Sequence, residues 1–225
     1  MSQRRRREAD GLPKVLLLSA ILALLTAAVL VTAAVRLFGR YPDPAEVEAN
    51  LPDYVTKDLL TVNDWSRPGD PLERVNGIVL HYVGNPGTTA QANRNYFESL
   101  SSGAERTYAS SHFIVGLEGE VLQCIPLTEI SYASNTRNGD TVAIEVCHPD
   151  AAGEYNLVTY SKVVELTAWL CRSFRLDPEK DVIRHYDVTG KRCPLYYVDH
   201  PEAWEALLSD IAAEITTQDS AEKDA

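Results

Sequence analysis

Residues 75–100 read VNGIVLHYVGNPGTTAQANRNYFESL, and this stretch decides the fold. It begins with the largely apolar run Val75–Val83, whose length is typical of a buried strand. The turn sequence GNPG at 84–87 ends the run, and Thr88 or Thr89 can then cap a helix that extends to the end of the stretch. A strand followed at once by a helix predicts a fold built in layers.

The downstream residues continue this mixture of strands and helices. Tyr108–Val115 and Val121–Ile125 are typical of strands, and the turn at 117–120 between them predicts a hairpin. The other predicted elements are a strand over Thr141–Cys147, a helix over Thr159–Phe174, a short strand over Val182–Arg184 and a last helix over Pro201–Ile215. This order predicts a mixed α/β (α+β) fold around one sheet.

The chain carries its charge unevenly. Its formal net charge is −11, yet residues 1–40 hold seven basic and two acidic side chains and so carry +5, which leaves −16 for residues 41–225. A body this acidic argues against sequence-independent nucleic-acid binding, which needs cations facing the phosphates. We therefore expect no nucleic-acid partner.

An uncharged run follows the basic N-terminal residues. Val15–Val35 spans 21 residues without a charged side chain, and as a helix it would extend over about 31 Å, close to one bilayer core. We predict a basic cytoplasmic head over residues 1–14 and a transmembrane signal-anchor helix over 15–38, which places the rest of the chain outside the cell membrane. The alternative is a cleaved signal peptide with its cleavage site near Ala33, although the run exceeds the usual signal core of about 7–15 residues.

The exported part divides into three predicted regions. Residues 39–71 are rich in Pro, Asp and Asn and predict a stalk, with one short helix near Pro44–Leu51 and a docking segment near Leu59–Trp65. A compact domain follows over residues 72–215, and residues 216–225 predict a flexible acidic tail. We expect this single domain to be a monomer.

Two histidines and one cysteine form a candidate metal site. His81 comes near the end of an apolar strand, and His185 ends the short strand before it is followed, eight positions on, by Cys193. A lone histidine is more often a satisfied core residue, and His-x7-Cys matches no common zinc-finger spacing. Together they offer two nitrogen ligands and one sulfur ligand, which is the number that a catalytic zinc uses while it keeps a fourth position for water.

The other cysteines do not form a recognisable disulfide framework. An extracellular location permits disulfides, but Cys193 as a metal ligand leaves three cysteines, so at least one stays unpaired. Each of Cys124, Cys147 and Cys171 lies within an apolar stretch. Buried free thiols are the simplest prediction.

Glu145 is the candidate general base. It lies in the predicted strand Thr141–Cys147, where an unpaired carboxylate among apolar neighbours is costly. Strand alternation places it on the face of Ala143 and Cys147. If this face is turned to the metal, Glu145 can take a proton from the attacking water and return it to the leaving amine. The alternative is a strand residue that faces solvent.

Lys191 is the candidate oxyanion stabiliser. It lies two residues before Cys193 and is therefore tethered close to the same metal. An ammonium group there can stabilise the oxyanion of a tetrahedral intermediate. The alternative is a solvated loop lysine.

Four segments carry a family resemblance: IVLHYVGNPGTTAQANRNYF, SSHFIVGLEGEVLQCIP, TVAIEVCH and VIRHYDVTGKRCP. Taken together and in this order, they resemble the N-acetylmuramoyl-L-alanine amidase family of the phage-endolysin and peptidoglycan-recognition type (Amidase_2). The likeness extends from roughly Leu72 to Trp204. It implies a central mixed sheet flanked by helices and a cleft with zinc at its floor.

The resemblance also implies roles for individual residues. The catalytic glutamate of the bacterial branch falls on Glu145, and the basic residue two before the third ligand falls on Lys191. Phage-type members often have a tyrosine directly before the histidine of the second strand, and Ser111 occupies that place here, which favours Glu145 as the base. The family's zinc ligands fall on His81, His185 and Cys193.

The predicted function is hydrolysis of the amide between N-acetylmuramic acid and L-alanine in peptidoglycan, with Zn²⁺ as cofactor. His112, His148 and Asn138 are candidate substrate-binding residues, although either histidine can equally be structural. Two other functions remain open. One is a non-catalytic peptidoglycan receptor on the same fold. The other is a zinc peptidase of the stem peptide, for which no HExxH motif is present.

Overall fold

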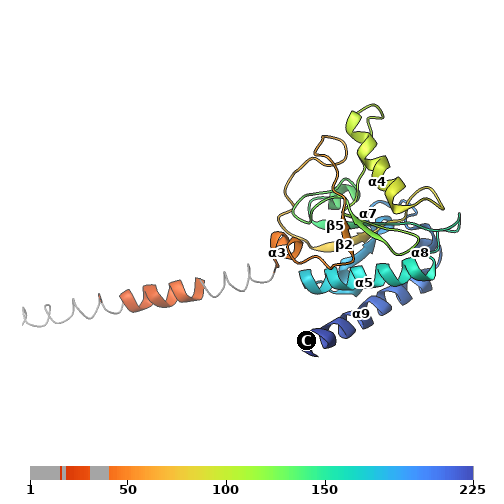
Figure 1. Cartoon of the computed structure of the whole chain (residues 1–225). Helices are drawn as coiled ribbons and strands as arrows, with labels where there is room; N and C mark the ends of the chain where they lie inside the picture. The colour runs from red at the N-terminus through yellow and green to blue at the C-terminus, as the bar shows by residue number, and fades with distance from the viewer. Residues whose placement is uncertain (1–15, 17–18, 31–40, 225) are drawn as a thin grey trace, which may run out of the picture. The chain divides into compact units, whose positions relative to one another are not determined.

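The computed structural model describes residues 16, 19–30 and 41–224, and the chain forms two compact units, Met1–Tyr41 and Pro42–Ala225 (Figure 1). In the first unit, residues 19–30 are helical, and their apolar side chains are exposed. The predicted basic head and part of the predicted membrane segment at 15–38 lie outside the described residues. Among the residues that are described, no helix has both the length and the apolar character of a membrane span.

The second unit contains one six-stranded mixed sheet in the order β1-β4-β3-β5-β2-β6. All neighbouring pairs are parallel except the antiparallel pair β3 and β4, which confirms the predicted hairpin and the predicted central mixed sheet. The strands are β1 (Val55–Lys57), β2 (Gly77–Leu80), β3 (Phe113–Val115), β4 (Val121–Gln123), β5 (Thr141–Val146) and β6 (Val182–Arg184).

Helices cover both faces of this sheet, with α5 and α9 packed together on one face and α4 on the other (Figure 1). Thr89 caps α4 as predicted, because its hydroxyl oxygen accepts a hydrogen bond from the Ala92 N–H at 3.1 Å. The helices are α3 (Pro44–Glu48), α4 (Ala90–Ser99), α5 (Leu157–Phe174), α6 (Pro178–Asp181), α7 (His185–Thr189), α8 (Leu195–Asp199) and α9 (Pro201–Asp224), with 3-10 turns η1 (Leu100–Ser102) and η2 (Asn135–Arg137).

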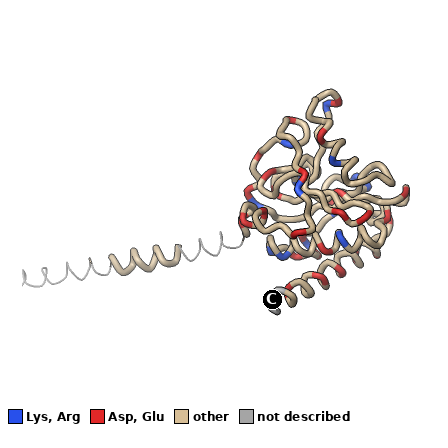
Figure 2. The backbone as a smooth tube through the Cα atoms, in the orientation of Figure 1, with Lys and Arg blue, Asp and Glu red and all other residues tan. Residues whose placement is uncertain are grey.

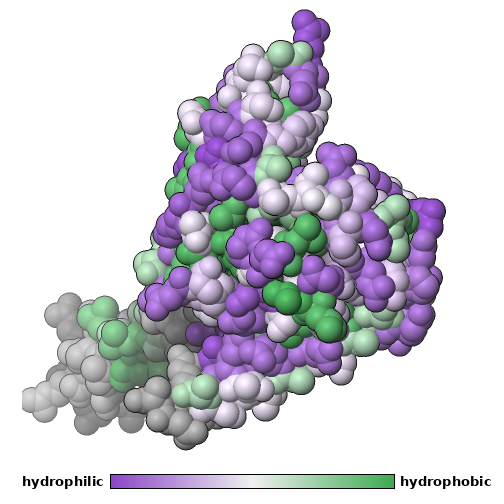
Figure 3. All heavy atoms as spheres, turned by 45° about the vertical axis from the view of Figure 1, so that its right-hand side comes forward, coloured by the Kyte–Doolittle hydropathy of each residue, from purple (hydrophilic) through white to green (hydrophobic). Residues whose placement is uncertain are grey.

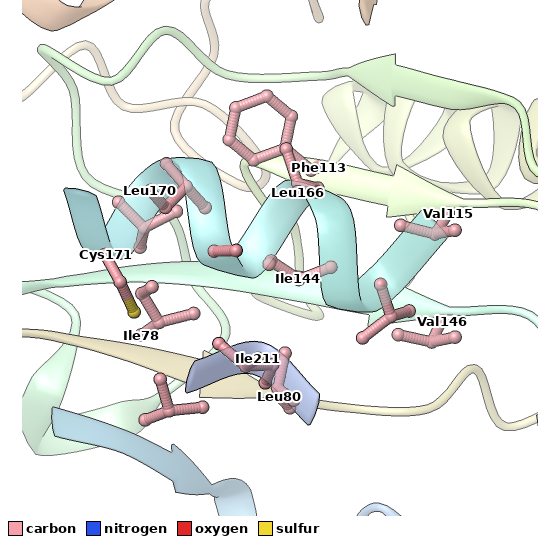
Figure 4. Packing of buried hydrophobic residues seen from close by; sticks show 14 of the residues in the cluster. Ile78, Leu80, Phe113, Val115, Ile144, Val146, Leu166, Leu170, Cys171 and Ile211 are labelled. Atoms are coloured by element: carbon pink, nitrogen blue, oxygen red, sulfur yellow. The ribbon is translucent and has the colours of Figure 1, made fainter. Parts of the chain in front are cut away.

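The main core lies between the sheet and the layer formed by α5 and α9. Successive strand residues point to opposite faces, and Ile144 of β5 faces this layer. Leu166 and Leu170 of α5 and Ile211 of α9 pack against the strands from this side (Figure 4). Cys147 belongs to a second apolar cluster on the face covered by α4. All four cysteines are buried and form no disulfide, which agrees with the prediction of buried free thiols at Cys124, Cys147 and Cys171.

The region predicted to be a stalk is folded from Pro42 onwards, which corrects the boundary placed at residue 72. β1 adds a strand to the sheet by parallel pairing with β4. Val47 of α3 and Leu60 are buried in the two apolar clusters. Because this segment contributes one strand and several core side chains, it belongs to the domain, and its scattered apolar residues were too widely spaced to predict that.

The predicted flexible tail is also wrong for the residues described, because α9 continues to Asp224. Two contacts attach the extension to α5. The Arg172 guanidinium is paired with Asp219 at 2.6 Å, and the side-chain amide of Gln218 donates to the carbonyl oxygen of Glu165 at 3.2 Å. Helix packing therefore decides the conformation of this polar segment.

The folded unit has an acidic and largely hydrophilic surface. Acidic positions outnumber basic ones along the described chain (Figure 2), in line with the net charge of −11. On the face that Figure 3 shows, hydrophilic residues predominate and hydrophobic ones form small groups.

Candidate metal and catalytic site

Three neighbouring strands bring their carboxyl ends to one edge of the sheet. β5, β2 and β6 are adjacent and parallel, and Leu80 of β2 is paired with Ile144 of β5 and with Arg184 of β6. Equal steps along parallel strands keep this register, so the next residue of each strand lies at the same level. These next residues are His81, Glu145 and His185.

Cys193 completes a set of metal-ligand atoms with His81 and His185. The three residues are buried, and one ligand atom of each lies within 4.8 Å of the others. Cys193 Sγ is 3.8 Å from His81 Nδ1, close to the distance of about 3.6 Å between nitrogen and sulfur ligands of a tetrahedral zinc. The loop is held there because the backbone N–H of Tyr186 donates to the carbonyl oxygen of Cys193 at 2.9 Å.

The chemistry of these residues fits zinc. Burial lowers the pKa of His81, with further lowering from His185 and Lys191, and burial also lowers the pKa of His185. Neutral imidazole is the form that binds a metal. Burial raises the pKa of the Cys193 thiol to about 12, so zinc binding at this site would release the thiol proton.

Glu145 lies directly beside this set. Its Oε1 is 4.0 Å from His81 Nδ1, and its Oε2 is buried with no hydrogen-bond partner among the described residues. Burial raises the pKa of this carboxyl to about 8, against a lowering by Lys191. An orphaned buried carboxyl oxygen is costly, so its position beside the metal-ligand set calls for a chemical role.

A pocket of about 420 Å³ opens onto the ligand atoms and Glu145. Lys191, which is exposed, belongs to its lining, so the sequence-predicted catalytic residues meet in one cavity. Its rim is aromatic. Tyr108 is 59% exposed, and its ring packs edge-on against Tyr132 at 5.3 Å and near Trp65 at 4.8 Å. The cavity therefore joins a polar floor to an apolar rim.

Ser111 does not face this pocket as a catalytic side chain would. It is buried between β3 and β5, where its hydroxyl group donates to the carbonyl oxygen of Ala143 at 2.9 Å. The hydroxyl oxygen of Ser111 in turn accepts a hydrogen bond from the backbone N–H of Glu145 at 3.2 Å. Ser111 therefore supports the backbone of the candidate base.

His112 and His148 do not line the pocket, which favours the structural role over the substrate-binding role that the sequence left open. Both are buried. His112 Nδ1 accepts from the Ala143 N–H at 3.0 Å, and its Nε2 lies 2.9 Å from the carbonyl oxygen of Glu129. The two ring nitrogens of His148 lie 2.6 and 2.8 Å from the backbone carbonyl oxygens of Asp150 and Val83. With both nitrogens held by the backbone, neither ring can offer a contact to a substrate.

Asn138 lines the pocket, but its side chain is turned to the backbone. Its Oδ1 accepts from the backbone N–H groups of Ser134 and Ala133, at 2.6 and 3.2 Å. Ser134 and Asn135 also contact the site, although the sequence did not single them out. Ser134 Oγ lies 3.3 Å from His81 Nε2, and Asn135 Oδ1 lies 3.1 Å from His185 Nε2. The only sequence feature that marked them was the turn-forming composition of residues 134–139.

Comparison with known proteins adds a family to this geometry. The Amidase_2 family model, described as N-acetylmuramoyl-L-alanine amidase, matches residues 71–195, which is more than half of the chain. N-acetylmuramoyl-L-alanine amidase BlyA of Bacillus subtilis (strain 168) is 29% identical over 72% of this chain and 47% of its own length. N-acetylmuramoyl-L-alanine amidase CwlL of Bacillus licheniformis is 33% identical over 64% of this chain and 42% of its own length.

The chain thus spans about half the length of the curated relatives it matches. Among solved structures, a mutant endolysin from Bacillus subtilis aligns with a TM-score of 0.58 at 23% identity, over 70% of this chain and 97% of that one, which supports the fold. The family match confirms the resemblance that the four sequence segments indicated. The chain belongs to the N-acetylmuramoyl-L-alanine amidase family.

Proposed function

We propose that this chain hydrolyses the amide bond between N-acetylmuramic acid and L-alanine in peptidoglycan. The observation that supports the proposal is the register of β5, β2 and β6, in which Glu145 and the candidate ligands His81 and His185 each directly follow paired residues. Cys193 reaches the same point from the following loop. Family membership indicates which bond is hydrolysed, because the curated relatives are named for this amidase activity.

The residues of the site divide the reaction between them. Zinc bound by His81, His185 and Cys193 would polarise the scissile carbonyl and lower the pKa of a coordinated water toward about 7. Glu145 accepts a proton from the attacking water and returns it to the nitrogen of L-alanine as the amide bond breaks. Lys191 offers a positive charge at the pocket wall to the oxygen that becomes negative.

The environment of Glu145 suits this acid–base role. Burial, which disfavours the carboxylate, raises the pKa of Glu145 to about 8 in the metal-free chain, and a zinc ion bound beside it would lower this value. A group whose pKa lies near the working pH is the most effective proton carrier. The exposed lysine at the pocket wall also favours the ionised carboxylate, so it supports the proton-accepting state as well.

Digestion of purified peptidoglycan by the full chain tests the proposal. Mass spectrometry should find stem peptides with a new free amine on L-alanine and glycan strands that retain N-acetylmuramic acid. Cleavage within the stem would identify a zinc peptidase, and binding without any product would identify a receptor. Full activity in Cys193→Ala or Glu145→Ala would show that the roles assigned here are wrong.

We also propose that residues 15–38 anchor the chain to the cell membrane as a single-pass helix, with the catalytic unit outside. The uncharged 21-residue run and the preceding basic residues support this. Cell fractionation followed by mass spectrometry of the N-terminus tests it. We expect an intact N-terminus in the membrane fraction, and a mature chain that begins near Ala34 in the medium would establish a cleaved signal peptide instead.

A further inference from the structure

One turn contacts both candidate histidine ligands through their Nε2 atoms. Residues 134–138, which include η2, lie between the end of the loop after β4 and the start of β5. Two consecutive side chains of this turn reach the two rings, Ser134 to His81 and Asn135 to His185. The two histidines are 104 positions apart, so a single short turn fixes residues from distant parts of the chain.

The contact to His185 favours a proton on one particular ring nitrogen. Asn135 Oδ1 lies 3.1 Å from His185 Nε2, and an amide oxygen can only accept. With the amide in this orientation, the contact favours a neutral ring that carries its proton on Nε2. This arrangement leaves Nδ1 with its lone pair to face the metal.

The contact to His81 leads to the same form of the ring. His81 Nδ1 is the nitrogen that faces Cys193 Sγ and Glu145 Oε1, at 3.8 and 4.0 Å. Ser134 Oγ lies 3.3 Å from the opposite nitrogen, Nε2. A hydroxyl oxygen can accept the Nε2–H hydrogen bond, so both rings can present Nδ1 to the same point.

The turn is held in a shape that aims these side chains. Asn135 has φ of 52°, in the left-handed region that few residues other than glycine adopt. Asn138 accepts from the Ser134 N–H at 2.6 Å, and the hydroxyl group of Thr141 donates to the carbonyl oxygen of Arg137 at 2.7 Å. Because Thr141 begins β5, these bonds tie the turn to the strand that carries Glu145. Uncommon backbone conformations held in this way cluster at functional sites.

We propose that Ser134 and Asn135 are positioning residues that hold His81 and His185 with Nε2 protonated and Nδ1 turned to the metal. The inference rests on the metal site of the proposed function. Asn138 keeps the turn in place for both contacts. An outer partner of this kind orients a histidine ligand and makes it a better electron donor.

The first test uses the full chain without metal and needs no variant. NMR of the histidine ring nitrogens distinguishes a proton on Nε2 from a proton on Nδ1. We expect both His81 and His185 to carry their proton on Nε2. A proton on Nδ1 of His185 would overturn the inference, whatever the enzyme does to peptidoglycan.

The second test measures zinc affinity by competition with a chromogenic chelator. Asn135→Ala and Ser134→Ala should each bind zinc about 10-fold more weakly, because an oriented partner is lost. Asn135→Asp keeps an acceptor oxygen and should restore both the affinity and the Nε2 proton. Thr136→Ala is the matched control, since Thr136 is exposed on the same turn, and should bind zinc as the wild type does.

These measurements separate the inference from the proposed function. Equal zinc affinity in Asn135→Ala, Ser134→Ala and the wild type would overturn the positioning role of these two residues. If Asn135→Ala does not fold, the ring protonation of the wild type and of Asn135→Asp still tests the positioning role. A chain that binds zinc through correctly protonated rings but releases no stem peptide would refute the amidase proposal and leave the positioning role intact.

Discussion

Two pairs of buried histidines differ in what their ring nitrogens contact. His81 and His185 each contact a side chain of the turn at 134–138 through Nε2, and Nδ1 remains for a ligand. His112 and His148 have both ring nitrogens within hydrogen-bond distance of backbone groups. Burial alone therefore does not identify a metal ligand, because all four rings are buried. The hydrogen-bond partner of each ring nitrogen is what distinguishes a candidate metal ligand from a structural histidine.

The largest effect should come from the first pair. His185→Ala removes a ligand, so zinc content should fall from one per chain to a small fraction of that. Amide hydrolysis should fall by at least about 10³-fold in kcat/KM, because the metal supplies several kcal/mol of transition-state stabilisation. Metal analysis and stem-peptide release check both. The control His200→Ala, at an exposed ring, should keep zinc and activity, and a zinc-loaded His185→Ala enzyme would contradict the distinction between the pairs.

The next effect separates proton transfer from metal binding at the same edge of the sheet. Glu145→Gln keeps the size of the side chain but removes its basicity, so kcat should fall by about 10²–10³-fold. Zinc affinity should change little, because Glu145 is not one of the three ligands. Parallel measurement of kcat and of zinc content decides the point. A loss of zinc equal to the loss of rate would make Glu145 a ligand rather than a base.

Acid should destabilise the protein through His112. Burial lowers the pKa of His112 to about 4, below its ordinary value of 6.5, so the unfolded chain binds more protons between these two pH values. Its contribution to stability is complete above pH 6.5 and is lost as the pH falls to about 4, a change of about 3 kcal/mol. Urea unfolding of the metal-free protein at several pH values measures it. The free energy of unfolding should depend less steeply on pH in His112→Asn. An equal dependence in the variant and the wild type would show that His112 is not the cause.

The smallest effect is expected from His148. His148→Asn breaks contacts to the carbonyl oxygens of Asp150 and Val83 and should lower the free energy of unfolding by about 1–3 kcal/mol. Zinc content should stay at one per chain, since neither ring nitrogen faces the ligand set. Thermal unfolding and metal analysis of the same sample test this. Loss of zinc with unchanged stability would place His148 with the first pair.

The sequence predicted the elements of the fold well where the hydrophobic pattern was periodic. α5 and β5 carry regular apolar spacing and lie within a few residues of their predicted positions. The segment before residue 72 was misjudged because β1 is only three residues long and is stabilised by its pairing with β4, a contact that no local pattern contains. The C-terminal end of α9 was missed for a related reason, since its stability depends on contacts to α5.

The candidate site was predictable in its residue types and less so in its geometry. His81, His185 and Cys193 could be grouped by chemistry, and the structure places their ligand atoms together. The side-by-side placement with Glu145 depends on strand order and register, which sequence spacing does not reveal. The contacts from Ser134 and Asn135 depend on the conformation of one turn, and polar turn residues are too common on protein surfaces to be singled out.

The shared register of β5, β2 and β6 also makes zinc a reporter of correct sheet assembly. A slip of one residue between two of these strands would turn a whole set of side chains to the opposite face and separate the ligands. Zinc at the proposed site would bind only the correctly paired chain, so at about 100 times its Kd it would favour that pairing by about 2.7 kcal/mol. The metal would then act during folding as a selector among strand alignments, before any substrate is bound.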